Sequence, residues 1–384
     1  MKHAYLIIAH SEYPILQILL SMLDEYGNDV YLHIDKRAKV LHRELKSFKM
    51  DKAGFFILEN PIKVYWGNIS QIKAEYLLFE TALANGPYAY YHLLSGTDLP
   101  IQKQEYIHNG QGPQPFFWRA PTDNDYGAKL PTRLKAWREA SYQTPKAESF
   151  NVSKDGDKSI VKVTYRFPQV DAQWEITYKV FANGIIKVDN RFVAEGTETP
   201  MIPRVGLRMQ LSEILNDLTY YGRGPEENYR DRRTSQFIGE YTTPIKDLYE
   251  PYIRPQENEH RTDIYWCALT TKQKAGLLFI ADRTFELNAS NYLLGSLDSG
   301  ETIDNGAPRT SETNHRHLTD PQPVKQVDMF IDYRMMGVGG DNSWGAIAHE
   351  PYLIRPGVEN AIEYGFSIVP FDKKADYKNL IYQY

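Results

Sequence analysis

The sequence predicts two fold classes in succession: a small parallel α/β sheet over residues 1–109, then a large antiparallel β-sandwich over residues 110–384. In the first part, apolar runs of strand length alternate with segments of helical period, which is typical of a parallel sheet with crossover helices. After about residue 110 the chain reads as almost pure β, with short period-two runs separated by turn residues. A length of 384 residues also favours two domains over one.

The first part begins with a continuous apolar run at 4–9, which indicates a strand covered on both faces. A helical stripe follows within 13–27, and a second strand is predicted at 29–35. Residues 69–85 form a strong helical pattern, and 88–96 is a further strand candidate. The order β–α–β, then α–β, predicts a partial parallel sheet.

The second part contains six clear period-two runs, each bounded by Gly, Asn, Asp or Pro. They lie at 159–167, 173–181, 184–193, 205–211, 275–281 and 324–335. Regular short strands of this kind predict a large antiparallel sandwich.

Composition excludes several classes of function. The net charge of −5 makes the chain a poor electrostatic partner for nucleic acid. No apolar run reaches the roughly 18–20 residues of a membrane helix, and the apolar start is interrupted at His10, Ser11, Glu12 and Pro14, so we expect neither a membrane span nor a signal peptide. The single cysteine, Cys267, is compatible with the cytoplasm, where we expect the protein.

Two features leave alternatives open. Aromatic residues make up 13% of the chain; such rings cover sugar faces, but they also fill sandwich cores, which we favour. His10, His33, Asp35 and Asp98 follow predicted strands, where an open α/β sheet binds ligands. These four residues either contact a nucleotide or act as helix caps and turn residues.

The segments "HAYLIIAH", "DVYLHIDKRA", "VYWGNISQIKAE" and "YYHLLSGTDLPI" resemble the start of the core-2/I-branching β-1,6-N-acetylglucosaminyltransferase family over residues 3 to about 109. The resemblance implies a GT-A-like fold that binds a nucleotide sugar without a bound metal. Its uridine–sugar pocket would be lined by His10, His33, Ile34 and Asp35, with Tyr65 or Trp66 nearby. The family's catalytic glutamate lies beyond the matching part, so we expect no glycosyl transfer and incomplete burial of the strand at 88–96.

Five further segments carry a second resemblance. They are "FFWRAPTDNDYG" (116–127), "YYGRGPEENYRDR" (220–232), "YEPYIRPQENEHR" (249–261), "SETNHRHL" (311–318) and "MMGVGGDNSWG" (335–345). In this order they resemble the small-chain, C-terminal domain of glycoside hydrolase family 2 β-galactosidases, a supersandwich related in fold to galactose mutarotases. The resemblance covers residues 113 to about 371 and allows a divalent cation, Ca²⁺ or Mg²⁺.

Each of these motifs reads as a loop. The loop "GRGPEENYRDR" could form a sugar or metal site, but its mixed charges favour a salt-bridged scaffold. The histidines of "ENEHR" and "HRH" could bind a metal, yet two further ligands would have to come from elsewhere, so scaffolding is again favoured. In "GGDNSWG", the glycines and the Asp–Asn pair make a tight turn that can present Trp344 to a hexose ring; a buried core tryptophan is the alternative.

By resemblance, Trp344 would stack on the leaving sugar in the active site of a neighbouring barrel. The loops that face this site contain the remaining predicted binding residues: Arg119, Asp123, Asp125, Glu226, Asn228, Glu257 and Asp341. No catalytic residue is predicted, because a retaining glycosidase needs two carboxylates about 5–5.5 Å apart. The family keeps that pair on a barrel that this sequence lacks, and the adjacent Glu226 and Glu227 would point to opposite faces of a strand.

The sequence therefore predicts a β-galactosidase domain that binds a galactoside together with a barrel-bearing chain. The alternatives are a non-catalytic carbohydrate-binding module and a remnant nucleotide-sugar-binding fragment. The two modules meet near 109–112, where both resemblances break off and little linker joins them. We interpret this seam as a fusion, natural or artefactual.

Overall fold

A computed structural model of the chain divides into two compact units, Met1–Asn109 and Gly110–Tyr384, and each is described by itself. The residues that the structure describes are 2–11, 13–65, 69–88, 90–95, 113–143, 145, 147–156, 158–181, 183–195, 201–298, 317–342, 344–357, 361–372 and 376–382. The seam at 109–112 lies outside them.

The first unit is built on a four-stranded sheet of order β3-β2-β1-β4, with every pairing parallel. Its strands are β1 (His3–Ala9), β2 (Asn28–Ile34), β3 (Gly54–Ile57) and β4 (Tyr90–Ser95). The predicted α/β class is therefore confirmed for this part. The strand at the third position in the chain, β3, was not predicted from the sequence.

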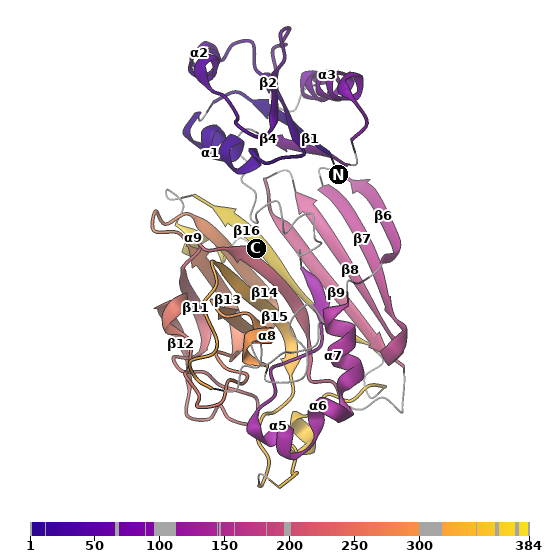
Figure 1. Ribbon diagram of the computed structural model, residues 1–384, viewed down its shortest axis with the longest axis vertical. Helices are drawn as coiled ribbons and strands as arrows, with labels where there is room; N and C mark the ends of the chain where they lie inside the picture. The colour runs from indigo at the N-terminus through magenta and orange to yellow at the C-terminus, as the bar shows by residue number, and fades with distance from the viewer. Residues whose placement is uncertain are drawn as a thin grey trace. The chain divides into compact units, whose positions relative to one another are not determined.

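Helices cover both faces of this sheet (Figure 1). The helices are α1 (Tyr13–Leu23), α2 (Lys39–Glu44) and α3 (Ile69–Asn85), with a 3₁₀ turn η1 (Leu45–Ser47). Leucines of α1 and α2 pack with one set of β1 and β2 side chains, and Leu78 and Ala82 of α3 pack with the opposite set. The edge strand β4 keeps Tyr90 and Leu93 partly exposed.

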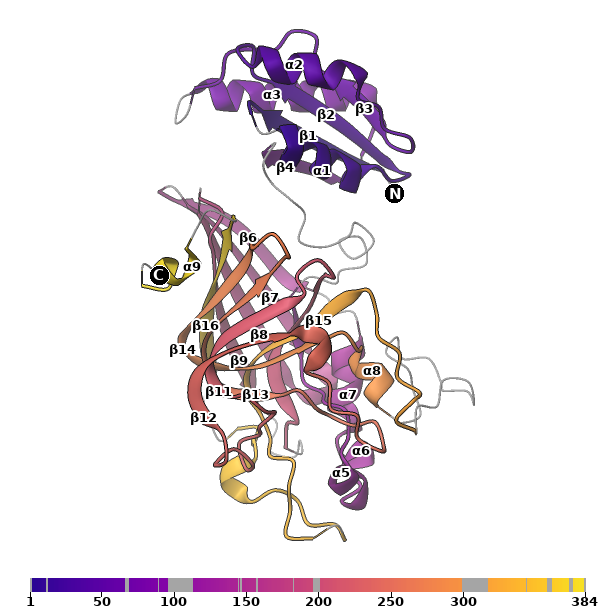
Figure 2. The same cartoon turned by 90° about the vertical axis from the view of Figure 1, so that its left-hand side faces the viewer.

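The second unit is one large, curled antiparallel sheet of twelve strands (Figure 2). Along its main path the order is β12-β11-β13-β14-β16-β9-β8-β7-β6, and β10, β15 and β5 join it at the side. The strands are β5 (Gln114–Phe116), β6 (Ala147–Asp155), β7 (Lys158–Phe167), β8 (Ala172–Phe181), β9 (Ile186–Ala194), β10 (Arg204–Ser212), β11 (Asp217–Gly224), β12 (Phe237–Pro244), β13 (Arg261–Thr270), β14 (Gly276–Ser290), β15 (Gln326–Met335) and β16 (Ile362–Phe371). The predicted antiparallel class is confirmed.

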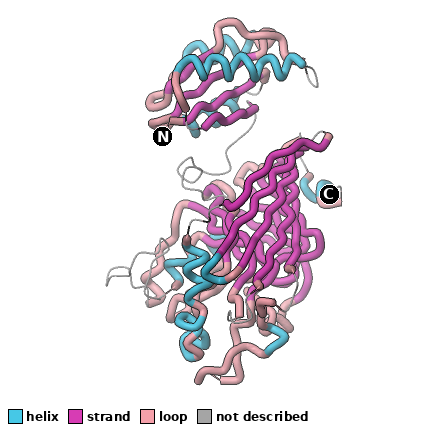
Figure 3. The backbone as a smooth tube through the Cα atoms, turned by 90° about the vertical axis from the view of Figure 1, so that its right-hand side faces the viewer, coloured by secondary structure: helices cyan, strands magenta, loops and turns pink. Residues whose placement is uncertain are grey.

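The expectation of almost pure β after the seam was wrong for residues 123–142. Figure 3 shows helices beside the long strands, and the residues concerned form α5 (Asp123–Gly127), α6 (Leu130–Arg133) and α7 (Lys135–Tyr142). Leu130, Leu134 and Trp137 are all buried, a helical spacing that turns one face toward the sheet. The smaller helical elements are η2 (Pro168–Val170), η3 (Ile245–Asp247), α8 (Leu294–Leu297), η4 (Glu350–Tyr352) and α9 (Tyr377–Leu380).

Aromatic rings fill the core of the second unit. Phe117 lies with its ring centroid 5.1 Å from Trp137, 5.6 Å from Trp174 and 5.4 Å from Phe192. Burying four such rings together supplies much of the apolar area that holds α7 against the sheet. The high aromatic content is therefore largely a core property, as favoured from composition.

Candidate functional site

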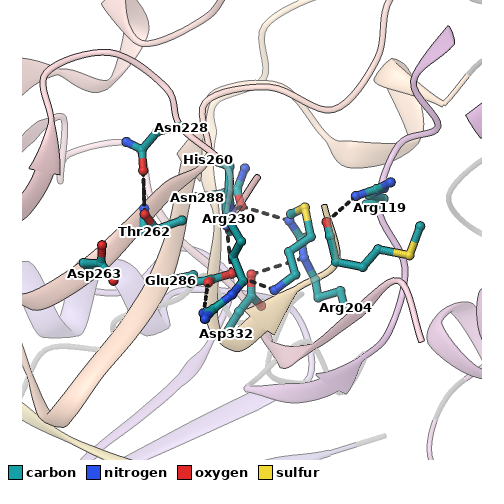
Figure 4. Close-up of polar contacts among 12 residues, drawn as sticks. Arg119, Arg204, Asn228, Arg230, His260, Thr262, Asp263, Glu286, Asn288 and Asp332 are labelled. Atoms are coloured by element: carbon teal, nitrogen blue, oxygen red, sulfur yellow. Dashed lines mark hydrogen bonds and ion pairs between the residues drawn. The ribbon is translucent and has the colours of Figure 1, made fainter. Parts of the chain in front are cut away.

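Four loop segments of the second unit meet around buried charges. They are residues 117–125, 224–233, 256–261 and 335–345, which overlap four of the five motifs quoted above. Each is held to another by hydrogen bonds that involve the backbone, so their shapes depend on one another. Figure 4 shows the polar contacts at their centre.

Arg119 joins the first of these segments to the last. The guanidinium is 2% exposed and donates to both oxygens of Asp125, at 3.1 and 2.8 Å. Its other N–H groups donate to the carbonyls of Met336 at 2.6 Å and Gly337 at 3.1 Å. Asp125 also accepts from the backbone of Thr122 and completes a capping box at the start of α5. Both predicted residues are thus engaged in fixing loops.

Glu257 is the central carboxylate of the second group of contacts. It accepts hydrogen bonds from the Ala120 backbone, the Arg204 guanidinium and the Asn288 amide, each at 3.0 Å. Glu257 and Arg204 are almost completely buried, so their charges depend on each other. Glu257, one of the predicted binding residues, therefore has a structural role: it links the backbone at Ala120 to Arg204 on β10.

His260 extends the network to β14. Its Nδ1 lies 2.8 Å from Oδ1 of Asn288, and its Nε2 lies 3.1 Å from Oε2 of Glu286. Both ring nitrogens face acceptor oxygens, an arrangement that is satisfied when each carries a hydrogen. Glu286 also accepts from Arg230 at 3.0 Å and from the Met335 backbone at 2.6 Å. Burial alone would raise the pKa of Glu286, but these donors outweigh it and leave the pKa below its ordinary value.

Asn228 ties the 224–233 loop to β13. Its Oδ1 accepts from the backbone and hydroxyl of Thr262, at 3.0 and 2.6 Å (Figure 4). Its Nδ2 donates to the carbonyls of Arg223 and Glu226. The Glu226 carboxylate itself is exposed. Because β11 ends at Gly224, Glu226 and Glu227 both lie in the following loop, as the motif predicts, and Asn228 closes this loop.

Asp231 fixes the start of the loop that carries Trp344. Its carboxylate accepts from the backbone N–H of Val338 at 3.1 Å and of Gly339 at 2.7 Å. A Cβ atom at Gly337 would lie 2.6 Å from the Asp231 carboxylate, which explains why glycine occupies this position. The loop therefore leaves the sheet in one defined direction.

Trp344 is 93% exposed, so it is not part of the core. Its backbone N–H donates to Oδ1 of Asn342 at 2.9 Å, and Asp341 lies 2.9 Å from the His349 ring. The next residue, Gly345, has φ +122° and approaches the end of α5 at Gly127. The loop presents a bare indole beside α5; a role in sugar binding stays a prediction.

A small pocket of about 220 Å³ is lined by residues of all four segments. Its lining residues are Thr122, Asp123, Asn124, Tyr229, Arg232, Tyr252, Gln256, Glu257 and Val338. Of the predicted residues, only Asp123 and Glu257 line it; Asp123 is exposed and lies 3.6 Å from Arg254. The pocket combines two phenol rings, a guanidinium and an open mouth, and its volume is below the roughly 300 Å³ at which complete ligand sites begin.

Sequence reasoning missed several residues of this site. Tyr229, Arg232 and Tyr252 lie in quoted motifs, where their aromatic and cationic chemistry was an available signal. Glu286 and Asn288 lie in the second half of β14, and no local pattern there distinguishes them from other strand residues. Their role could not be predicted from the sequence, because the residues that they contact are distant in the chain.

No set of metal ligands supports the metal hypotheses in the part of the chain that the structure describes. There, no group of three or more His, Cys, Asp or Glu residues is arranged to hold a metal ion. His315 of the "HRH" motif lies outside the described residues.

In the first unit, His10, His33, Ile34 and Asp35 lie at the carboxyl ends of β1 and β2, and Tyr65 lies in the segment after β3. His33, Ile34 and Asp35 are buried, whereas His10 is exposed and Tyr65 is 49% exposed. His33 accepts from the Ile62 backbone at 3.0 Å. Its pKa is lowered, chiefly because burial disfavours the charged ring.

Asp35 is engaged within its own loop. Arg37 donates to both oxygens through its side chain, at 3.0 and 2.8 Å, and the Val64 N–H donates at 2.9 Å. The pKa of Asp35 is lowered, above all by the Arg37 hydrogen bonds. Arg37 lies 4.5 Å from the Tyr65 ring centre, so one guanidinium orders both residues. Trp66 lies outside the described residues.

Comparison with known families defines the class of protein. The sequence model described as "Beta galactosidase small chain" matches residues 95–368, and the model of "Core-2/I-Branching enzyme" matches residues 3–111. The chain belongs to the β-galactosidase small chain family, preceded by a segment that matches the branching-enzyme family. Both resemblances drawn from the motifs are thereby confirmed.

Relatives among curated proteins agree with this assignment. The chain is 33% identical over 243 residues to a β-galactosidase of Priestia megaterium, covering 63% of this chain and 22% of that protein. It is 31% identical over 248 residues to a β-galactosidase of Streptococcus thermophilus, covering 64% and 22%. The match thus spans about a fifth of the length of these relatives.

Solved structures show a weaker likeness. A galactose 1-epimerase of Lactobacillus acidophilus covers 58% of this chain and 66% of its own, with 7% identity and a TM-score of 0.34. An aldose epimerase homologue of C. elegans covers 58% and 68%, with 11% identity and a TM-score of 0.32. In the described residues, no helix has both the length and the apolar character to cross a membrane.

Proposed function

We propose that residues 110–384 act as the small-chain part of a glycoside hydrolase family 2 β-galactosidase. In this role the domain shapes a site for a galactoside such as lactose on a barrel-bearing chain, and Trp344 stacks on the leaving sugar. The observation that carries the proposal is the 93% exposure of Trp344 on a loop that is anchored by the buried Arg119 and the half-buried Asp231. An exposed indole on a rigid support is suited to the apolar face of a hexose.

The same geometry supports a positioning role without hydrolysis by this chain alone. Hydrolysis with retention needs two available carboxylates across the scissile bond. Of the two carboxylates that line the small pocket, Glu257 accepts three hydrogen bonds from the protein, and Asp123 is exposed at the mouth. The small pocket would become a complete site only with walls from the partner.

Complementation tests the proposal. The full chain is mixed with a barrel fragment of a family 2 β-galactosidase, and nitrophenyl-galactoside cleavage is measured. We expect the mixture to exceed the barrel fragment alone and the Trp344→Ala chain to lose about tenfold of that gain, the size of one lost stacking contact. Phe150→Ala, which removes an exposed ring from β6, outside these loops, is the matched control. No gain on mixing, or turnover by the chain alone, would contradict the proposal.

The exposed indole also favours a second candidate, a non-catalytic carbohydrate-binding module. Titration with galactose or lactose, followed by tryptophan fluorescence, would then give a saturable change in the wild type that is absent in Trp344→Ala. A flat response in both proteins rules the module out. In either role we propose that the protein acts in the cytoplasm, in keeping with its one cysteine, the buried Cys267.

A further inference from the structure

A second hollow in the described part of the chain shares no lining residue with the small pocket and lies where β14 changes partners. Residues Gly276–Ala281 of β14 pair with β16, and residues Glu286–Ser290 pair with β15. Between these two stretches, 282–285 pair with neither strand. A sheet that forks in this way leaves a space between the diverging strands, and a groove of about 860 Å³ opens there.

The walls of the groove are strongly polar. Its lining residues include five carboxylates, four guanidinium groups, two threonines, an asparagine and two tyrosines: Glu175, Asp189, Asp263, Asp282 and Glu363; Arg191, Arg230, Arg283 and Arg334; Thr177 and Thr284; Asn190; and Tyr333 and Tyr364. A volume of this size lies within the roughly 300–1,000 Å³ of ligand sites.

Every one of the five carboxylates already has a cation. Glu175 pairs with Lys162 at 2.7 Å, and Asp189 pairs with Lys179 at 2.8 Å. The other three pairs are Asp263 with Arg223 and Arg233, Asp282 with Lys187, and Glu363 with Arg191. The negative charge of the walls is therefore neutralised by the protein itself, and most of the neutralising cations lie outside the lining.

Hydrogen-bond donors, by contrast, are left over. Asn190 is 4% exposed; its Oδ1 accepts from the Trp174 indole at 3.0 Å, but its Nδ2 has no partner among the described residues. The Nε atoms of Arg230 and Arg334 are buried and likewise unpartnered. Arg283 and Arg334 make no ion pair with any described carboxylate. Unsatisfied buried donors are costly, so a ligand that supplies acceptor oxygens would gain each of these bonds.

We propose that this groove binds a carboxylated sugar of the hexuronate class. The guanidinium and amide donors would take the carboxylate, because guanidinium groups match carboxylates in charge and geometry. The Arg334 guanidinium lies 5.1 Å from the ring centre of Tyr333, which orients it within the groove, and the hydroxyls of Thr177 and Thr284 can bond the hydroxyl groups of the sugar. This site is separate from the galactoside site proposed above.

Calorimetric titration of the full chain tests this, with galacturonate, galactose and acetate as three probes. We expect saturable binding of galacturonate. Galactose, which lacks the carboxylate, and acetate, which lacks the sugar ring, should both bind more weakly. Replacing both leftover arginines (Arg283→Gln with Arg334→Gln) should weaken galacturonate binding by about tenfold or more, since two charge-assisted contacts are lost. Added salt should weaken it as well.

Two control variants show whether the groove itself is the binding site. Arg43→Gln makes the same change on an arginine of the first unit and should leave binding unchanged. Trp344→Ala should also leave galacturonate binding unchanged, even if it abolishes galactoside effects. The proposal is overturned if galacturonate does not bind, if acetate or galactose binds equally well, or if Trp344→Ala weakens binding while the arginine pair does not. Circular dichroism of the double arginine variant checks that it is folded.

Discussion

The imidazole of His260 bridges Asn288 and Glu286 in a space closed to solvent, with its Nε2 3.1 Å from the Glu286 carboxylate. The Glu286 carboxylate also accepts a hydrogen bond from the Arg230 guanidinium. The Asn288 amide donates a hydrogen bond to the Glu257 carboxylate. A continuous polar chain thus runs from the fork of β14 to the small pocket. The loops around Trp344 are held by buried charges, so they should be sensitive to single polar substitutions.

Removing the imidazole should destabilise the second unit. In His260→Ala, the buried Glu286 loses one of its donors and Asn288 loses a partner, which we expect to lower the free energy of unfolding by about 3 kcal/mol. Urea denaturation measures this. His349→Ala, which removes an exposed histidine next to Asp341, should show no measurable change. Equal effects of the two substitutions would mean that the buried bridge contributes nothing.

Glu257 should matter more than any exposed glutamate. Glu257→Ala leaves Arg204 buried with one of its carboxylate partners gone and frees the Ala120 N–H, so we expect a loss of about 3–5 kcal/mol. The matched change Glu226→Ala, at an exposed carboxylate two residues before Asn228, should leave the unfolding curve in place. If the midpoint urea concentration of Glu257→Ala equals that of the wild type, the hydrogen-bond network around Glu257 does not stabilise the fold.

Stability should fall with rising pH because of Glu259. Burial raises the pKa of this carboxyl to about 8, and its Oε1 has no partner among the described residues. Between these two pKa values the folded chain keeps the Glu259 proton, whereas the unfolded chain, in which the carboxyl has its ordinary pKa of 4.5, releases it. The contribution of Glu259 to the free energy of unfolding is therefore full below about pH 4.5 and is lost as the pH rises toward 8.

The variant Glu259→Gln keeps a neutral side chain at every pH. Relative to wild type, it should become more stable as the pH is raised from about 5 to about 9, which melting temperatures across that range measure. Burial also raises the pKa of Asp332, to about 7. Its contribution to the pH dependence of stability is the same in both proteins and cancels in the comparison. A difference that does not change with pH would show that Glu259 is ionised throughout.

Two tryptophans of the second unit should respond in opposite ways. Trp344→Ala should leave the free energy of unfolding within about 0.5 kcal/mol, because the ring is 93% exposed. Trp174→Ala should cost about 3–5 kcal/mol, because that ring is fully buried among Phe117 and Phe192 and donates to Asn190. Strong destabilisation by Trp344→Ala would mean that the indole packs on the protein instead of facing a ligand.

The first unit offers a nucleotide test. If Tyr65, ordered by Arg37, stacks on a uracil ring, UDP should raise the melting temperature, and Tyr65→Ala should reduce that rise. Inorganic phosphate serves as the control for a purely ionic effect. Because Asp35 is already engaged by Arg37 and Val64, we expect its contribution to be indirect. No rise with UDP would exclude nucleotide-sugar binding.

Several features were accessible from local pattern. The apolar run at β1 and the period-two runs at β7, β8 and β9 predict their strands, since alternation along one segment shows which faces are buried. Helices α5 to α7 were missed, although Leu130, Leu134 and Trp137 have helical spacing. The run expected at 275–281 extends in the structure to Ser290, because β14 continues after it changes partners.

The sequence by itself determined the order of the two fold classes and the choice of Trp344 as an exposed ring. These are properties of short segments, in which backbone preference and side-chain period act over a few residues. Only the tertiary structure decided that Arg119, Asp125 and Glu257 fix loops, and that Asn190, Arg283 and Arg334 share a groove. Whether a polar side chain is engaged or available depends on partners many residues away, and no single segment contains that information.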